Sequence, residues 1–176
     1  MYKITESFDQ GLVVSGNCSF NHDDNYMVKL YTKCNSSQTY SLSGHTIYTN
    51  TTWNSSFAMK GVLEITYGTT LTITGSSTKI RFADSKSTGI PTYIKIDQGG
   101  CLRLENGAEI TSIDNSVCPG SMWDGIVILG NSSQSQGSYG NYATIASQGY
   151  LSINNATISN ARCAAHTGAY GSNTNN

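Results

Sequence analysis

Apolar residues two positions apart recur at a constant spacing along this chain, and this spacing limits the possible folds more than any other feature. Leu63–Ile65 is matched later in the chain by Ile94–Ile96. Leu71–Ile73 is matched by Leu102–Leu104 at the same offset in sequence number. Alternation with period two is typical of strands that bury one face. Short strands that repeat every ~30 residues indicate stacked coils.

A third copy of the pattern contains an insertion. Ile126–Ile128 follows Ile94–Ile96 at nearly the same offset. In the earlier copies the second apolar pair comes soon after the first, as Leu71 follows Ile65. Leu151–Ile153, by contrast, follows Ile128 only after a long polar segment. We therefore expect an insertion loop at about residues 129–148.

The repeats predict an all-β fold, a right-handed parallel β-helix (a solenoid), over residues 46–176. Each coil would carry about three short strands, and like side chains would stack about 4.8 Å apart. Two interior ladders are expected, formed by Leu63, Ile94 and Ile126 and by Leu71, Leu102 and Leu151. A β-sandwich is the alternative, because short alternating strands also suit it, but equal offsets at four strand positions favour the solenoid.

Residues 1–45 have a different pattern, with two alternating segments, Leu12–Ser15 and Tyr26–Tyr31, around a polar loop. They resemble part of a blade from the propeller repeats of secreted bacterial proteins. A β-hairpin that caps the open end of the solenoid is equally consistent with the pattern. The loop segment Asn21–Asn25 lacks the spaced aspartates of a calcium loop, so we interpret it as a solvated turn.

Composition excludes several partners. Charged residues are 12% of the chain and the net charge is −1, so no basic surface is available for nucleic acid or an anionic membrane. No apolar run approaches the ~18 residues of a membrane span. The five cysteines form no CxxC motif and no histidine pair has zinc spacing. We expect no metal and no cofactor.

The sequence also gives no catalytic constellation. Parallel β-helices often carry polysaccharide lyases or hydrolases, and glycoside hydrolysis needs two carboxyl groups at one cleft. Glu64 and Lys95 occupy equivalent outward positions in successive repeats, as do Thr72 and Arg103, so no carboxylate ladder forms. We therefore expect a non-catalytic chain.

Trp123 and Asp124 stand between a Cys-Pro-Gly turn and a short apolar segment. Trp123 is expected either to pack at a coil corner or to act as an exposed sugar platform. Asp124 is expected to accept hydrogen bonds from backbone N–H groups in its turn. Gly125 permits a bend there that a β-branched residue could not adopt.

The insertion is the better candidate for a ligand-binding site, because long polar loops on a short-looped scaffold often carry function. Side chains that could bond to or stack on a glycan are Asn131, Gln134, Gln136, Tyr139 and Tyr142. A plain surface excursion is the alternative, since loop entropy grows slowly with length.

From about residue 50 to 165 the order of features resembles large secreted proteins of Bacteroidota exported by the type IX system. The most specific matches are the segments "CPGSMWDGIVILGNSS" and "NATISNA". The resemblance implies β-helical or propeller regions, an extracellular or outer cell-surface location, and a C-terminal sorting domain elsewhere. The chain ends in "GAYGSNTNN" and begins without an apolar signal segment, so we expect a fragment of a longer exported protein.

These observations predict a non-catalytic structural or adhesive segment of a secreted cell-surface protein. The alternative is a carbohydrate-binding or polysaccharide-degrading β-helix module. Extracellular polysaccharide or surface glycan is the expected partner. End-to-end self-association is also expected, because the end of a solenoid exposes apolar ladders and strand edges.

Overall fold

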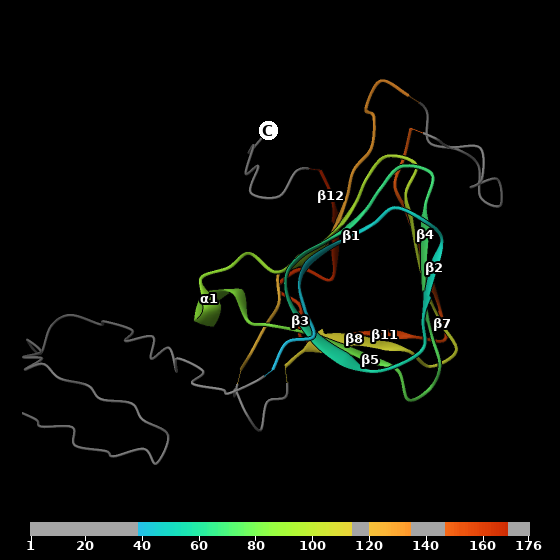
Figure 1. The fold of residues 1–176 in the computed structure, drawn as a ribbon. Helices are drawn as coiled ribbons and strands as arrows, with labels where there is room; N and C mark the ends of the chain where they lie inside the picture. Colours follow the sequence, from blue (N-terminus) through green and yellow to red (C-terminus); the bar gives the residue numbers. More distant parts are fainter. Residues whose placement is uncertain (1–38, 114–119, 135–146, 169–176) are drawn as a thin grey trace, which may run out of the picture.

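The computed structural model describes residues 39–113, 120–134 and 147–168, and these residues form an all-β structure, as the sequence predicts (Figure 1). The one helix in the described part is α1, Ser85–Thr88. The strands are β1 Leu42–Ile47, β2 Thr51–Trp53, β3 Phe57–Ile65, β4 Thr70–Thr74, β5 Lys79–Phe82, β6 Tyr93–Ile96, β7 Cys101–Glu105, β8 Glu109–Ser112, β9 Gly125–Ile128, β10 Tyr150–Asn154, β11 Thr157–Ile158 and β12 Ala165–Thr167.

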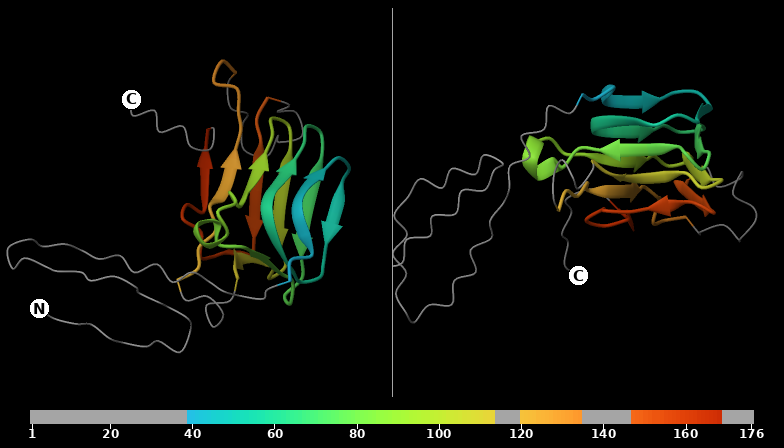
Figure 2. Two further views of the ribbon diagram at one scale, coloured as in Figure 1. Left: turned by 60° about the vertical axis from the view of Figure 1, so that its left-hand side comes forward. Right: turned by 90° about the horizontal axis from the view of Figure 1, so that it is seen from below.

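The strands pair in parallel throughout the described part and curl around one apolar core. One sheet has the order β11-β8-β5-β3-β6-β9-β12, with β1 also beside β3, and the other has the order β10-β7-β4-β2. The start of β3 pairs with β5 and its end pairs with β6. Figure 2 shows the strands stacked from β1 at one end to β12 at the other. Parallel pairing differs from the antiparallel sheets of a β-sandwich.

The register confirms both predicted interior ladders. Ile94 lies between Leu63 and Ile126. Leu102 lies between Leu71 and Leu151 in the other sheet. Leu151 is partly buried, and the other ladder residues are completely buried. Burial of each aliphatic side chain contributes about 1.5–3 kcal/mol, which explains why the period-two pattern sets the inward face.

The predicted repeat of ~30 residues is longer than the shortest coil. In the β1–β3 pair, Leu42 lies opposite Met59 and Ile47 lies opposite Ile65. Each of these separations along the chain is little more than half of that between Leu63 and Ile94, which are paired in the next coil. The step from β3 to β6 is longer because α1 and its flanking loop are inserted before β6. The constant spacing between matching apolar residues therefore includes the segment around α1, which lies outside the core.

The expected domain boundary at residues 45 and 46 falls within β1, which runs from Leu42 to Ile47. Residues 1–38 lie outside the described residues, so the hairpin and the propeller blade both remain predictions. A glycine makes the bend inside β3: Gly61 has φ +78°, and a Cβ there would lie 3.1 Å from the Gly44 backbone nitrogen.

Candidate functional site

Three charged side chains from successive coils meet at one corner of the core. Asp84 follows β5, Asp124 precedes β9, and Arg162 precedes β12. Arg162 Nη2 lies 2.9 Å from Asp84 Oδ1, and Arg162 Nε lies 3.0 Å from Asp124 Oδ1. The exposed fractions of the side chains are 14% for Asp84, 4% for Asp124 and 27% for Arg162. We call these three residues the corner cluster.

The carboxylate of Asp124 is fully engaged within the protein. Its Oδ1 also accepts a hydrogen bond of 2.7 Å from Ser85 Oγ, and its Oδ2 accepts one of 2.9 Å from the backbone N–H of Thr92. Thr92 belongs to the preceding coil, which differs from the expectation that Asp124 bonds within its own turn. The register places Tyr93 opposite Gly125, so the residues just before them are also neighbours. The Asp124 side chain therefore joins coils rather than presenting a charge to a ligand.

Trp123 is fully buried and stacks on Phe82, with ring centroids 4.7 Å apart and planes inclined by 16°. Its indole Nε1–H donates a hydrogen bond of 2.9 Å to the carbonyl oxygen of Ser159. This arrangement is the packing interpretation of Trp123. A sugar platform needs an accessible ring face, which the fully buried Trp123 does not offer, so the prediction of Trp123 as an exposed ligand-binding residue is wrong. At Gly125 a Cβ would overlap the carbonyl oxygen of Cys163, which explains the glycine.

The insertion begins and ends at a paired neck, close to the predicted positions. Gly130 and Gln148 form an antiparallel bridge, and the Gly149 N–H donates to the Leu129 carbonyl oxygen at 2.7 Å. Asn131 Oδ1 accepts from the Ser133 N–H at 2.9 Å, which makes Asn131 part of a turn.

Among the predicted ligand-binding residues of the insertion, Asn131 is partly exposed and Gln134 is exposed. Gln136, Tyr139 and Tyr142 lie outside the described residues. Trp123 thus lies in the core, and its neighbour Asp124 lies beside the core in the corner cluster. Asn131 and Gln134 lie separately, on the neck of the insertion.

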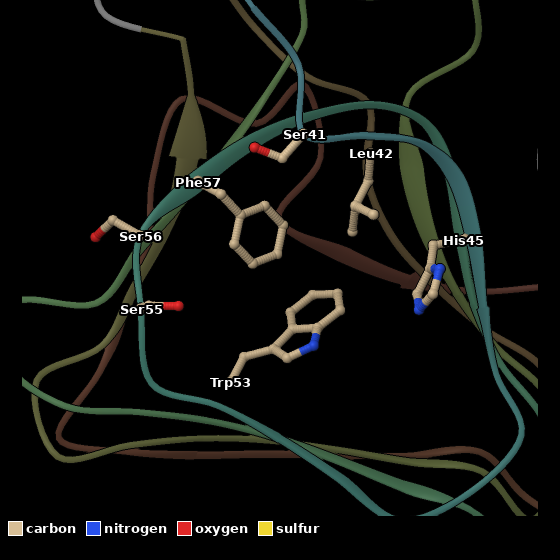
Figure 3. Close-up of a pocket in the computed structure, with 7 residues that line it drawn as sticks. All are labelled: Ser41, Leu42, His45, Trp53, Ser55, Ser56 and Phe57. Carbon is tan, nitrogen blue, oxygen red and sulfur yellow. The ribbon is translucent and has the colours of Figure 1, made fainter.

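The sequence interpretation did not anticipate a pocket at the end of the stack where the described chain begins. The pocket has a volume of about 290 Å³ and is lined by Ser41, Leu42, His45, Trp53, Ser55, Ser56 and Phe57. Trp53 and Phe57 meet edge to face with ring centroids 4.9 Å apart. Figure 3 shows Leu42, Trp53 and Phe57 pointing into the space that the first coil encloses. We call this the end pocket.

Three apolar side chains of the end pocket occupy core positions. Trp53 lies opposite Ile73 of β4, so it occupies a core position on β2. Leu42, Trp53 and Phe57 all pack against the buried core. Among the residues that the structure describes, the pocket is the uncovered end of that core, and its lining contains no carboxylate.

Ion pairs link neighbouring strands on the outside. Lys95 Nζ lies 2.6 Å from Glu64 and 2.9 Å from Asp97, and these hydrogen bonds, Glu64 first, raise the pKa of Lys95. Lys79 Nζ lies 2.7 Å from Glu109. Burial raises the pKa of Glu109, but the hydrogen bonds from Lys79 and Ser159 outweigh burial, and the net pKa is below the ordinary value.

Across residues 39–113, 120–134 and 147–168, no group of three or more His, Cys, Asp or Glu side chains could hold a metal ion. The same residues contain no helix of the length and apolar character that crossing a bilayer requires. Comparison with protein-family models, curated proteins and solved structures gives no significant match for this chain.

Proposed function

We propose that this chain is a non-catalytic structural or adhesive segment of a secreted bacterial cell-surface protein, built as a right-handed parallel β-helix. The proposal rests on the parallel strand ladders, which share one apolar core. Successive coils of the chain add their strands to these ladders in the same order. Crossover connections between parallel strands are right-handed in about 98% of cases, which supports the handedness. Repeated coils of this kind form stiff, extended bodies in which each coil contacts its neighbours.

The polar contacts of the described residues support a structural role. In the corner cluster, Arg162 separates Asp84 from Asp124 and bonds to both, so the two carboxylates do not flank an open cleft. A glycoside hydrolase needs two carboxyl groups that reach substrate. Neither this cluster nor the end pocket provides such a pair.

The proposed location rests on the resemblance to exported Bacteroidota proteins and on a sequence rich in Asn, Ser and Thr. Brief proteolysis of intact cells of the source bacterium tests it. Peptides of this chain should be released while a cytoplasmic marker protein stays intact. Protection of the chain in intact cells, with digestion only after lysis, would reject a surface location.

Carbohydrate binding through the insertion is the second candidate function, favoured by its exposed start at Gln134 and its paired neck. Retention of the chain on a panel of immobilised polysaccharides should then be lost in Tyr139→Ala/Tyr142→Ala. The matched control is Tyr48→Ala/Tyr67→Ala, which removes two exposed tyrosines from turns of the described part. Equal retention of both variants, or none by the parent chain, would remove this candidate.

A further inference from the structure

The end pocket contains a tryptophan that the core covers on one side only. Trp53 lies opposite Ile73 of β4 and packs against the core. Among the described residues, β2 pairs only with β4, so no strand lies on the other side of Trp53. Trp53 is partly exposed, whereas Trp123 is fully buried. An accessible indole can stack on a ligand and donate a hydrogen bond to it.

Other rings and an aliphatic side chain surround Trp53. Phe57 meets it edge to face, with ring centroids 4.9 Å apart and planes inclined by 77°. The His45 ring centroid lies 6.2 Å from that of Trp53. Leu42 points into the same space (Figure 3). The pocket therefore has apolar walls that suit the CH groups of a ligand.

Polar groups of the pocket remain available to a ligand. Within the described part of the chain, the Trp53 indole N–H, the Ser55 hydroxyl and the His45 ring have no hydrogen-bond partner. Figure 3 shows the Ser55 oxygen turned toward the enclosed space, and the Trp53 indole nitrogen on the side near His45. Ser56 differs, because its Oγ donates a hydrogen bond of 2.8 Å to the Ser77 carbonyl oxygen.

Charge and size narrow the class of ligand. The pocket lining contains no Asp, Glu, Lys or Arg side chain. A phosphate or carboxylate would therefore find no lysine or arginine to pair with. The volume of about 290 Å³ lies just below the ~300–1,000 Å³ of pockets for drug-sized ligands, so a smaller ligand fits. A neutral sugar ring combines this size with CH groups that stack on an aromatic ring and hydroxyls that exchange hydrogen bonds.

We propose that the end pocket binds one neutral sugar ring of an extracellular polysaccharide or glycan. The ring stacks on Trp53, and its hydroxyls bond to Ser55, His45 and the indole N–H. This inference rests on the adhesive form of the proposed function and names its ligand class. The site lies at the end of the stack, separate from the insertion.

Two-dimensional N–H correlation spectra of the isotopically labelled full chain test the proposal directly. The chain has two tryptophans and therefore two indole N–H signals, and Trp53→Phe identifies the one from Trp53. The neutral probes are the methyl glycosides of glucose, galactose and N-acetylglucosamine. At least one of them should shift the Trp53 signal saturably and leave the Trp123 signal unchanged. Methyl glucuronide and methyl galacturonide should bind at least about fivefold more weakly than the best neutral sugar, because their carboxylate would lose water without gaining a cation.

A pair of matched variants tests the polar contacts. His45→Ala/Ser55→Ala keeps the Leu42, Trp53 and Phe57 walls but should weaken binding at least about fivefold, because it removes two hydrogen bonds to the sugar. The control is Ser43→Ala/His166→Ala, which changes the same residue types outside the pocket lining. It should bind like the parent chain. Circular dichroism confirms that both variants are folded, and equal weakening in both would contradict binding in the end pocket.

The remaining outcomes separate this inference from the proposed function. If none of the neutral sugars shifts the Trp53 signal, the proposal is overturned, but a structural segment on the cell surface still stands and is tested by the proteolysis of intact cells. A Trp53 signal that shifts with protein concentration and not with sugar would assign the end pocket to a second copy. Equal shifts of both indole signals would show a general solvent effect and would also overturn the proposal.

Discussion

Arg162 bonds through Nε to Asp124 and through Nη2 to Asp84, so one guanidinium connects residues that lie 38 and 78 positions before it. Asp84 also accepts a hydrogen bond of 3.0 Å from the Lys86 N–H at the start of α1. The corner cluster therefore fixes the excursion that contains α1 to two later coils. Removing Arg162 would leave both carboxylates without their charge partner in a largely buried position.

The first prediction concerns this cluster. Arg162→Ala should lower the free energy of unfolding by about 3 kcal/mol, because it leaves the buried carboxylate of Asp124 unpaired. Urea denaturation measures the change. Arg103→Ala is the matched control, since Arg103 is exposed on β7, and it should change stability by less than about 0.5 kcal/mol. Equal effects of the two substitutions would show that the cluster does not stabilise the stack.

The second prediction concerns Trp123. Trp123→Ala should lower the free energy of unfolding by about 3–5 kcal/mol, because it leaves a cavity against Phe82 and removes the hydrogen bond to Ser159. The neighbouring residue Met122 is exposed, so Met122→Ala should have a much smaller effect. A stable Trp123→Ala protein that loses polysaccharide binding would instead support an exposed tryptophan.

The third prediction concerns acid stability. The folded-state pKa of Glu109 is below its ordinary value of 4.5. Its stabilising contribution is therefore present above pH 4.5 and is lost as the pH falls through the lower folded-state value. Glu109→Gln should flatten the decline in unfolding free energy in this range, measured by urea denaturation at a series of pH values. An unchanged slope would mean that Glu109 titrates alike in the folded and unfolded chains.

The fourth prediction concerns alkaline stability. The folded-state pKa of Lys95 is above its ordinary value of 10.5, through Glu64 and Asp97. The contribution of Lys95 is present below pH 10.5 and is lost as the pH rises through the raised value. Lys95→Met should remove this loss, measured by urea denaturation at a series of alkaline pH values.

Lys60→Met is the matched control, because it also removes one positive charge. Lys60 lies on β3, and its Nζ lies over the Tyr40 ring, 5.7 Å from the ring centroid. This variant should keep the alkaline decline of the parent chain. If both variants lose the decline equally, net charge rather than the contacts of Lys95 controls alkaline stability.

The fifth prediction concerns the opposite end of the stack. Ile153 lies opposite Leu104 at a core position of β10, yet 51% of it is exposed. We expect concentration-dependent association through this end, measured by sedimentation velocity. Ile153→Lys should weaken association, and Asn154→Lys, next to it on the same strand, should not. A parent chain that stays monomeric at high concentration would contradict end-to-end association.

The interior ladders could be predicted because each depends on local alternation, and because the offset along the ladder of Leu63, Ile94 and Ile126 is nearly constant. Leu63, Ile94 and Ile126 are therefore visible in the sequence as a series. The corner cluster was not predictable, because loops of unequal length bring Asp84, Asp124 and Arg162 together. The first coil was missed since His45 replaces an aliphatic residue at a position where the later coils have Leu63 and Ile94.

The pairing of Leu63 with Ile94, and of Ile94 with Ile126, is the relationship on which the structural proposal depends. Backbone Hα–HN nuclear Overhauser effects in uniformly labelled protein measure it most directly. Stacked parallel coils should give the parallel pattern between β3 and β6 and between β6 and β9, in the register Leu63–Ile94–Ile126. Antiparallel effects, or a register shifted by one residue, would contradict stacked parallel coils.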